Sequence, residues 1–341
     1  MQRQHGGDGL HPARGGPQPS SWSRSTPPHD VFRTSFPATH TTEGVSPAVH
    51  SLAIIEAPSV LGLRPGGVAH LPTALLRAGL VEDFDVARSV RLDPPPFDPS
   101  RDPETGVLNA PAIARYSAEL ADAVETALDQ DLFPIVLGGD CTILLGNLLA
   151  LRRRGRHGLL FLDGHTDFYQ PSAEPNGEAA SMELALATGR GPAVLTDLEG
   201  RGPLLRDEDV VAFAYRDEPE STEAGMQPLP PALHAMDLNR VRAMGIEAAT
   251  SQALAHLSTP FWTHLDADVL HDTVMPAVDY RTPDGLTWPE LDHVLTAALT
   301  DPRCRGLDIT IFNPHLDPTG AITTRFASSL HGALSAITAH R

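Results

Sequence analysis

The chain has 341 residues with a formal net charge of −18, and 41% of its residues are hydrophobic, which is ample for a buried core. All 25 Lys+Arg residues are arginine, because the sequence contains no lysine. Lysine-dependent chemistry such as a Schiff base or a P-loop is therefore excluded, and the acidic balance argues against nucleic acid or an anionic membrane surface as a partner.

Residues 1–48 are rich in glycine, proline, serine, threonine and histidine, so we expect a disordered tail before one domain over residues 49–341. No apolar run is long enough to span a bilayer, and the N-terminal region lacks the apolar stretch of a signal peptide. The two cysteines, Cys141 and Cys304, are too few for the disulfide framework of a secreted protein. We therefore expect a cytoplasmic protein.

From residue 51 onward, short apolar runs alternate with helical patterns. The predicted strands cover residues 51–56, 133–137, 158–162, 210–214, 260–265 and 306–312. The predicted helices cover residues 72–80, 111–130, 142–151, 180–188 and 289–299, and the arginine-rich residues 152–156 predict a solvated turn. Strands that are apolar on both faces and alternate with helices predict an α/β fold, with a parallel sheet covered on both sides.

Carboxylates and one histidine follow two of these strands. Asp163, His165 and Asp167 come directly after the strand at 158–162, and Asp266 and Asp268 come after the strand at 260–265. In an extended segment, residues two apart point the same way, and ligands of open α/β sheets bind at the carboxyl ends of strands. We therefore expect these five side chains to converge.

Several carboxylates at one point repel each other unless cations lie between them. Several aspartates with one histidine suit a hard to borderline ion such as Mn²⁺, and the number of ligands fits two ions better than one. The competing interpretation is a set of unrelated turns, because aspartate is common in turns.

With these motifs the chain resembles the arginase/agmatinase (ureohydrolase) family, from about residue 50 to its end. The matching segments are residues 137–140 (LGGD), 163–167 (DGHTD) and 266–268 (DAD), with support from residues 276–286, 308–314 and 316–320. The resemblance implies a three-layer α/β fold with a central parallel sheet, two Mn²⁺ ions and a homo-oligomer. It also implies a small-molecule guanidino substrate, or a related amidine, whose C–N bond is hydrolysed.

The resemblance also assigns roles to individual residues of these motifs. Asp163 and Asp266 resemble ligands that bridge both ions, His165 and Asp268 resemble ligands of one ion, and Asp167 resembles a ligand of the other. Asp167 also resembles the family's catalytic acid, which passes a proton to the departing amine.

The sixth ligand of the family is a histidine, and here that position is Cys141. A thiolate ligand is softer and would also favour Zn²⁺ or Fe²⁺. The alternative is that Cys141 is buried without binding metal, which leaves one ion weak or absent.

Two further departures concern the substrate. Ile311 stands where the family has a glutamate that orients the guanidinium, and Ala180 stands where its arginases have a histidine. Residues 216–218 (RDE) resemble the loop near the substrate amine. The cysteine directly after Gly-Gly-Asp is a further point of resemblance, to an actinobacterial branch of the family that includes hydroxyarginine hydrolases.

The sequence therefore supports two main hypotheses. The first is a Mn²⁺-dependent hydrolase of a guanidino, substituted-guanidino or amidine C–N bond. The second is a degenerate member of the family, with an impaired metal site, that acts as a non-catalytic binding or regulatory subunit. A zinc deacetylase on a similar fold is less well supported, because no histidine pair or catalytic tyrosine is evident.

Overall fold

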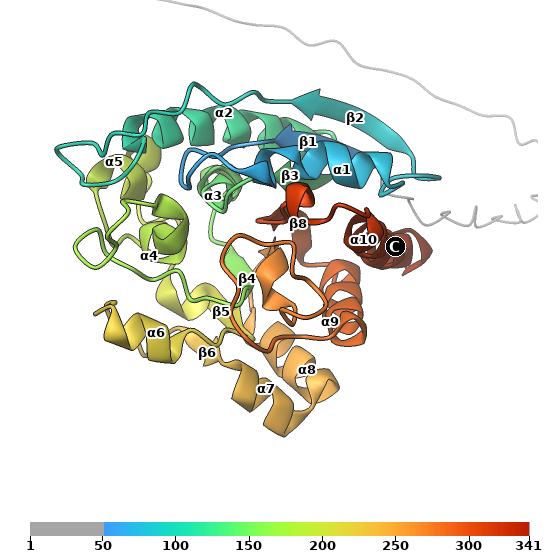
Figure 1. Ribbon diagram of the computed structural model, residues 1–341. Coiled ribbons are helices and arrows are strands. Elements are labelled where there is room, and N and C mark those ends of the chain that lie inside the picture. The colour runs from blue at the N-terminus through green and yellow to red at the C-terminus, as the bar shows by residue number, and fades with distance from the viewer. Residues whose placement is uncertain (1–50, 341) are drawn as a thin grey trace, which may run out of the picture. The chain divides into compact units, whose positions relative to one another are not determined.

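The computed structural model describes residues 51–340, with side chains up to Ile337. The predicted tail and its boundary at residue 49 lie outside the described residues. Eight parallel strands form one sheet in the order β2-β1-β3-β8-β7-β4-β5-β6 (Figure 1). The strands are β1 (Leu52–Ala57), β2 (Val86–Arg91), β3 (Phe133–Gly138), β4 (Gly158–Leu162), β5 (Val210–Phe213), β6 (His234–Met236), β7 (Phe261–Asp266) and β8 (Cys304–Thr310).

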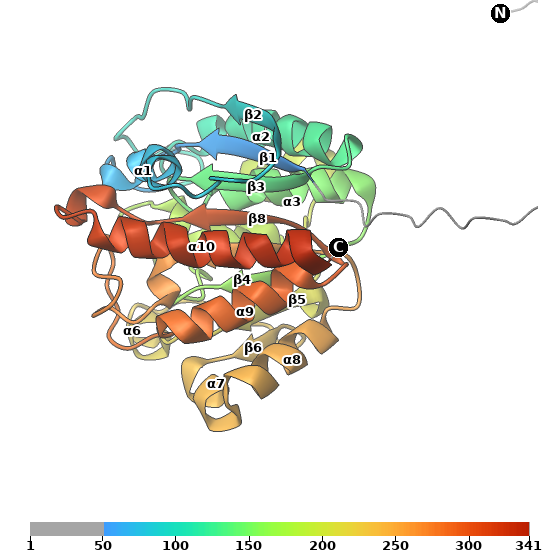
Figure 2. The ribbon, with the colours of Figure 1, turned by 90° about the vertical axis from the view of Figure 1, so that its right-hand side faces the viewer.

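Helices cover both faces of the sheet, which gives three layers (Figure 2). One face packs against α2 (Ala110–Asp129), α3 (Ile143–Arg154), α4 (Glu183–Ala187) and α5 (Ala193–Thr196). The other face packs against α1 (Leu71–Arg77), α7 (Leu238–Met244), α8 (Ile246–His256), α9 (Trp288–Thr300) and α10 (Ala321–His340). The short helix α6 (Glu218–Glu223) follows β5. The predicted fold class is therefore confirmed.

The apolar runs located the six inner strands to within two residues at either end, and the two edge strands were missed. In β2 (VARSVR), half-buried and exposed residues alternate, so the strand has no continuous apolar run. The edge strand β6 has only three residues. An edge strand is covered less completely than an inner one, and its sequence therefore carries a weaker apolar pattern.

The prediction of a solvated turn at residues 152–156 was wrong for its first three residues. Arg152 to Arg154 form the last turn of α3. Arg153 ties this turn to its surroundings through ion pairs with Asp122 and Glu125 of α2 and with Glu199. These pairs favour continuation of the helix, so the turn begins only at Gly155.

The strand order brings the functional motifs together. β4 pairs with β7, β7 pairs with β8, and β8 pairs with β3, so the carboxyl ends of these four strands are neighbours. The loops after β3, β4 and β7 carry Cys141, Asp163 and Asp268, respectively. No helix in the described part of the chain is both long and apolar enough to cross a membrane.

Candidate metal centre

The loop after β4 turns sharply instead of continuing extended. The carboxylate of Asp163 accepts a hydrogen bond of 2.6 Å from the backbone N–H of His165, and Asp167 has a left-handed backbone with φ of 44°. The predicted extended geometry was therefore wrong. The three side chains still reach one region, because the turn points Asp163 toward both His165 and Asp167.

The loop after β7 is also a turn. Asp266 ends the strand, and its carboxylate accepts a 2.7 Å hydrogen bond from the backbone N–H of Asp268, which lies in a short 3-10 helix, Ala267–Val269. The carboxylate of Asp268 accepts a 2.9 Å hydrogen bond from the N–H of Gly164. This bond joins the two loops and sets the spacing between their carboxylates.

One set of candidate ligands consists of Asp163, His165 and Asp268, whose ligand atoms lie within 4.8 Å of one another. His165 Nδ1 is 2.9 Å from Asp268 Oδ2. Burial alone would lower the pKa of His165, but the charge of Asp268 and their hydrogen bond raise that pKa to about 10. The same pairing outweighs burial at Asp268 and lowers its pKa to about 2.

A second set lies beside the first, on the Cys141 side. Asp163, Asp167 and Glu183 offer carboxylate oxygens within 4.8 Å of one another, and the thiol of Cys141 donates a 3.0 Å hydrogen bond to Asp266 Oδ2. Burial, reinforced by the neighbouring carboxylates, raises the pKa of these four carboxyl groups and of the Cys141 thiol.

The donor set fits a pair of divalent cations. Within residues 51–340, Asp163 Oδ2 and both carboxylate oxygens of Glu183 are buried without a hydrogen-bond partner. Buried carboxylates are normally paired with cations or bind metals, and the chain has no lysine to neutralise them. All six predicted ligands lie in this region, and Asp163 belongs to both sets.

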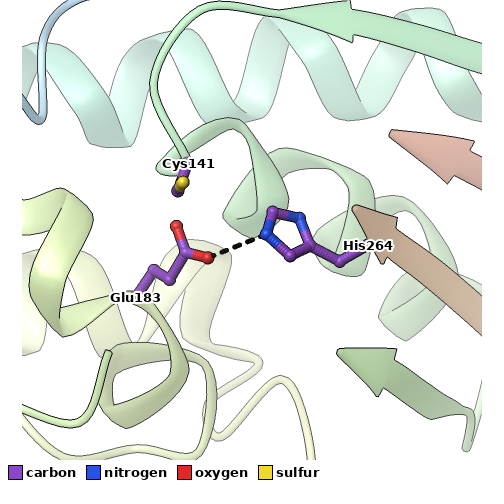
Figure 3. A group of neighbouring side chains, drawn as sticks. All are labelled: Cys141, Glu183 and His264. Carbon is purple, nitrogen blue, oxygen red and sulfur yellow. Dashed lines mark ion pairs between the residues drawn. The ribbon is translucent and has the colours of Figure 1, made fainter. Parts of the chain in front are cut away.

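Two buried residues of the centre were missed by the sequence analysis. Glu183 is the first residue of α4, and His264 lies on β7 two residues before Asp266. With Cys141 they form a third set of candidate ligands within 4.8 Å, and Figure 3 shows their side chains pointing toward one another. The available signal was a lone glutamate within the apolar, alanine-rich segment 179–187.

A cavity of about 330 Å³ opens onto the centre. Cys141, His165, Asp167, Asp266 and Asp268 line one part of it, together with Ala180 and Ile311. Asp217, predicted to lie near a substrate amine, also lines the cavity.

The side chain of Asp217 accepts hydrogen bonds from the backbone N–H and the hydroxyl of Thr166, at 3.0 and 2.8 Å. Asp217 therefore braces the loop that carries His165 and Asp167.

Comparison with known proteins agrees with this architecture. The model of the Arginase family matches residues 50–336. The chain belongs to the arginase family. Members of this family are hydrolases that act on C–N bonds in linear amidines and depend on two metal ions. The family membership predicted from the motifs is confirmed.

Individual relatives are distant in sequence but similar over nearly their full length. An arginase of Bacillus subtilis (strain 168) is 28% identical over 299 residues, covering 83% of this chain and 98% of the relative. The structure of Bacillus caldovelox arginase has a TM-score of 0.74 at 24% identity, covering 84% of this chain and 98% of that one. A formimidoylglutamase structure from Bacillus subtilis has a TM-score of 0.66 at 16% identity, and the match covers 85% of this chain and 88% of that one.

Proposed function

We propose that this arginase-family protein is a Mn²⁺-dependent hydrolase of a substituted guanidino compound of the hydroxyarginine type. His165 and Asp268 would hold one ion, Cys141 and Asp167 would hold the other, and Asp163 and Asp266 would contribute to both. The observation that carries the proposal is the convergence of these side chains at the end of a cavity, with buried oxygens that lack partners.

Two bound cations would supply a nucleophile for the amidine carbon, because metal ions lower the pKa of water toward about 7. The protein's own contribution begins with Asp167, which lines the cavity. Its carboxylate would accept the proton released by the nucleophile and pass it to the departing nitrogen. Gly164 and Thr166 hold the loops in place through their bonds to Asp268 and Asp217.

The cavity wall supports the choice of substrate. Ile311 is only 6% exposed and lines the cavity, so it offers an apolar surface where the family has a carboxylate. An apolar side chain cannot form the charge-assisted bonds that a guanidinium requires. An N-hydroxyl group withdraws electrons and lowers the basicity of a guanidine. A hydroxyguanidine therefore loses less binding free energy than a guanidinium when the carboxylate at this position is missing.

A substrate panel tests the proposal. We expect hydroxyarginine, in the presence of Mn²⁺, to give the highest kcat/KM among hydroxyarginine, arginine, agmatine, guanidinobutyrate and formiminoglutamate. The measurement is release of urea, a substituted urea or formamide. No product from any of the five would refute the hydrolase assignment, and a preference for arginine would refute the substrate assignment.

The non-catalytic alternative is favoured by Cys141, Ala180 and Ile311 together, because all three depart from the family pattern. Metal analysis of the purified protein separates the two proposals. Two tightly bound ions per chain would argue against a degenerate site. Unchanged metal content in Cys141→Ala would rule out the cysteine as a ligand. The homo-oligomer and the cytoplasmic location stay predictions.

A further inference from the structure

Glu183 carries a buried carboxylate beside the metal centre. It is 0% exposed, and neither of its carboxylate oxygens has a hydrogen-bond partner in the part of the chain that the structure describes. It begins α4, directly after a 3-10 helix, Ala179–Met182, and its carboxylate points toward the Cys141 sulfur and the His264 ring (Figure 3). A glutamate on a surface helix would be solvated, so this placement needs a positive charge or a proton nearby.

His264 is positioned for metal binding by the strand that carries it. Residues two apart on a strand share a face, so His264 and Asp266 lie on the same side of β7. The pairing of β7 with β8 sets His264 opposite Asp308 and Asp266 opposite Thr310. The ring also stacks on Phe161 of β4, with ring centroids 4.9 Å apart.

The hydrogen-bond partner of one His264 ring nitrogen determines which nitrogen carries the hydrogen and which is free to bind a metal ion. His264 Nδ1 is 2.6 Å from Asp308 Oδ2, and Asp308 also accepts a hydrogen bond from the indole N–H of Trp262. A carboxylate held in this way accepts, so Nδ1 carries the hydrogen and Nε2 keeps its lone pair. Metal-binding histidines commonly donate their other ring N–H to a carboxylate, and this bond orients the ring.

The lone pair of His264 faces the carboxylates. Nε2 is buried and has no hydrogen-bond partner among the described residues, and it lies 3.3 Å from Glu183 Oε1 and 3.9 Å from Asp163 Oδ2. His264 Nε2 is thus a neighbour of partnerless carboxylate oxygens from both Asp163 and Glu183. A divalent cation bound among these side chains would give each of them a partner.

We propose that Glu183 and His264 are additional ligands of the ion on the Cys141 side, an inference that rests on the proposed metal-dependent function. They bring a hard oxygen and a borderline nitrogen to the position where a sulfur replaces the family's histidine. The ion on the other side is held by Asp163, His165 and Asp268, a set that does not include Glu183. Loss of Glu183 therefore affects one ion of the two.

The test is metal content, measured with Glu183→Gln, a variant of nearly the same size that lacks the charge. After desalting, elemental analysis is expected to give two Mn²⁺ per wild-type chain and one per variant chain. Titration with Mn²⁺ is expected to show at least about tenfold weaker binding at the affected position, the range found when groups supporting a metal ligand are removed. His264→Gln is expected to give the same result, so the test does not depend on one variant folding.

Asp209→Asn is the matched control. Asp209 is also a buried carboxylate, but it is paired with Arg156 and precedes β5, at the opposite end of the strands from the metal centre. This variant is expected to retain both ions.

The outcomes separate this inference from the proposed function. Two ions bound with unchanged affinity by Glu183→Gln and by His264→Gln would overturn the inference alone. A wild-type protein without tightly bound ions would overturn both. A wild-type protein that holds two ions and hydrolyses none of the panel, while Glu183→Gln loses one ion, would overturn the function and support the inference.

Discussion

Ile311 is held in a backbone conformation that its side chain disfavours. Its φ is 65°, in the left-handed region, where β-branched residues are rare. Its N–H donates a 2.9 Å hydrogen bond to the carbonyl of Gly139, which holds the backbone in place just after β8. Strain of this kind persists where the surrounding structure imposes it, commonly at binding sites. The apolar side chain is therefore presented to the cavity by a fixed backbone.

Restoring a carboxylate at Ile311 is expected to change which substrate is preferred. Ile311→Glu should raise kcat/KM for arginine by roughly 10-fold or more, because charge-assisted hydrogen bonds contribute about 1.5–3 kcal/mol. Activity on hydroxyarginine should fall relative to arginine. The measurement is steady-state kinetics on both substrates. Ile311→Gln, of similar size but uncharged, is the control, and an equal gain from it would show that charge is not the cause.

His157 gives the protein a pH-dependent stability that is independent of the metal centre. It is buried directly before β4, its Nε2 has no hydrogen-bond partner among the described residues, and burial lowers its pKa to about 4. The unfolded chain binds a proton below about pH 6.5 that the folded chain does not accept. Stability is therefore complete above pH 6.5 and falls as the pH drops toward 4.

We expect His157 to make the free energy of unfolding about 2 kcal/mol lower at pH 5 than at pH 7, since each unit of pKa difference corresponds to about 1.36 kcal/mol. His157→Asn should keep a donor near the carbonyl of Gly155 and reduce this pH dependence. Urea unfolding at the two pH values measures the difference. An unchanged pH dependence in the variant would show that other groups are responsible.

At the scale of elements, the end of α3 is joined to α2 by one arginine. Arg153 has a side chain only 13% exposed and contacts Asp122, Glu125 and Glu199. Among the described residues its neighbour Arg154 forms one ion pair, with Asp129, and the Arg154 side chain is 42% exposed. Because exposed single pairs contribute little, the two arginines are expected to differ in their effect on stability.

Arg153→Gln is expected to lower the free energy of unfolding by about 1–2 kcal/mol, because three ion pairs of a largely buried guanidinium are lost together. Arg154→Gln is the control and should change it by less than about 1 kcal/mol. Thermal or urea unfolding of the two variants checks the prediction. Equal losses would mean that the three contacts of Arg153 do not act as a network.

At the scale of the whole molecule, the metal centre concentrates acidic side chains at one edge of the sheet. Burial raises the pKa of Asp163, Asp167, Glu183 and Asp266. Without metal, the folded chain keeps protons that the unfolded chain releases above about pH 4, so metal-free stability decreases as the pH rises. Metal ions replace those protons and remove the penalty.

Removal of metal with a chelator is therefore expected to lower the Tm, and to lower it more at pH 8 than at pH 6. Addition of Mn²⁺ in excess should restore it, with about 2.7 kcal/mol gained at a concentration 100 times the Kd. Differential scanning calorimetry at both pH values measures the effect. Equal Tm values with and without Mn²⁺ at both pH values would contradict a metal-stabilised fold.

The inner strands, the long helices and the motif residues after β4 and β7 were predictable, because apolar periodicity and strand-end motifs are local properties of the chain. The edge strands were not, because β2 is polar and β6 is short. The turns at Asp163 and Asp266 were not predictable either, because they depend on hydrogen bonds from the backbone two residues later to these carboxylates.

The amino-acid sequence by itself thus determined the class of fold, the family and six candidate ligands. Only the tertiary structure decided that Glu183 and His264 face Cys141. Glu183 comes from α4, on one face of the sheet, and His264 comes from β7 within it, separated by 81 residues in the chain. No local pattern links residues so far apart, since their contact arises from the order in which β3, β8, β7 and β4 pair.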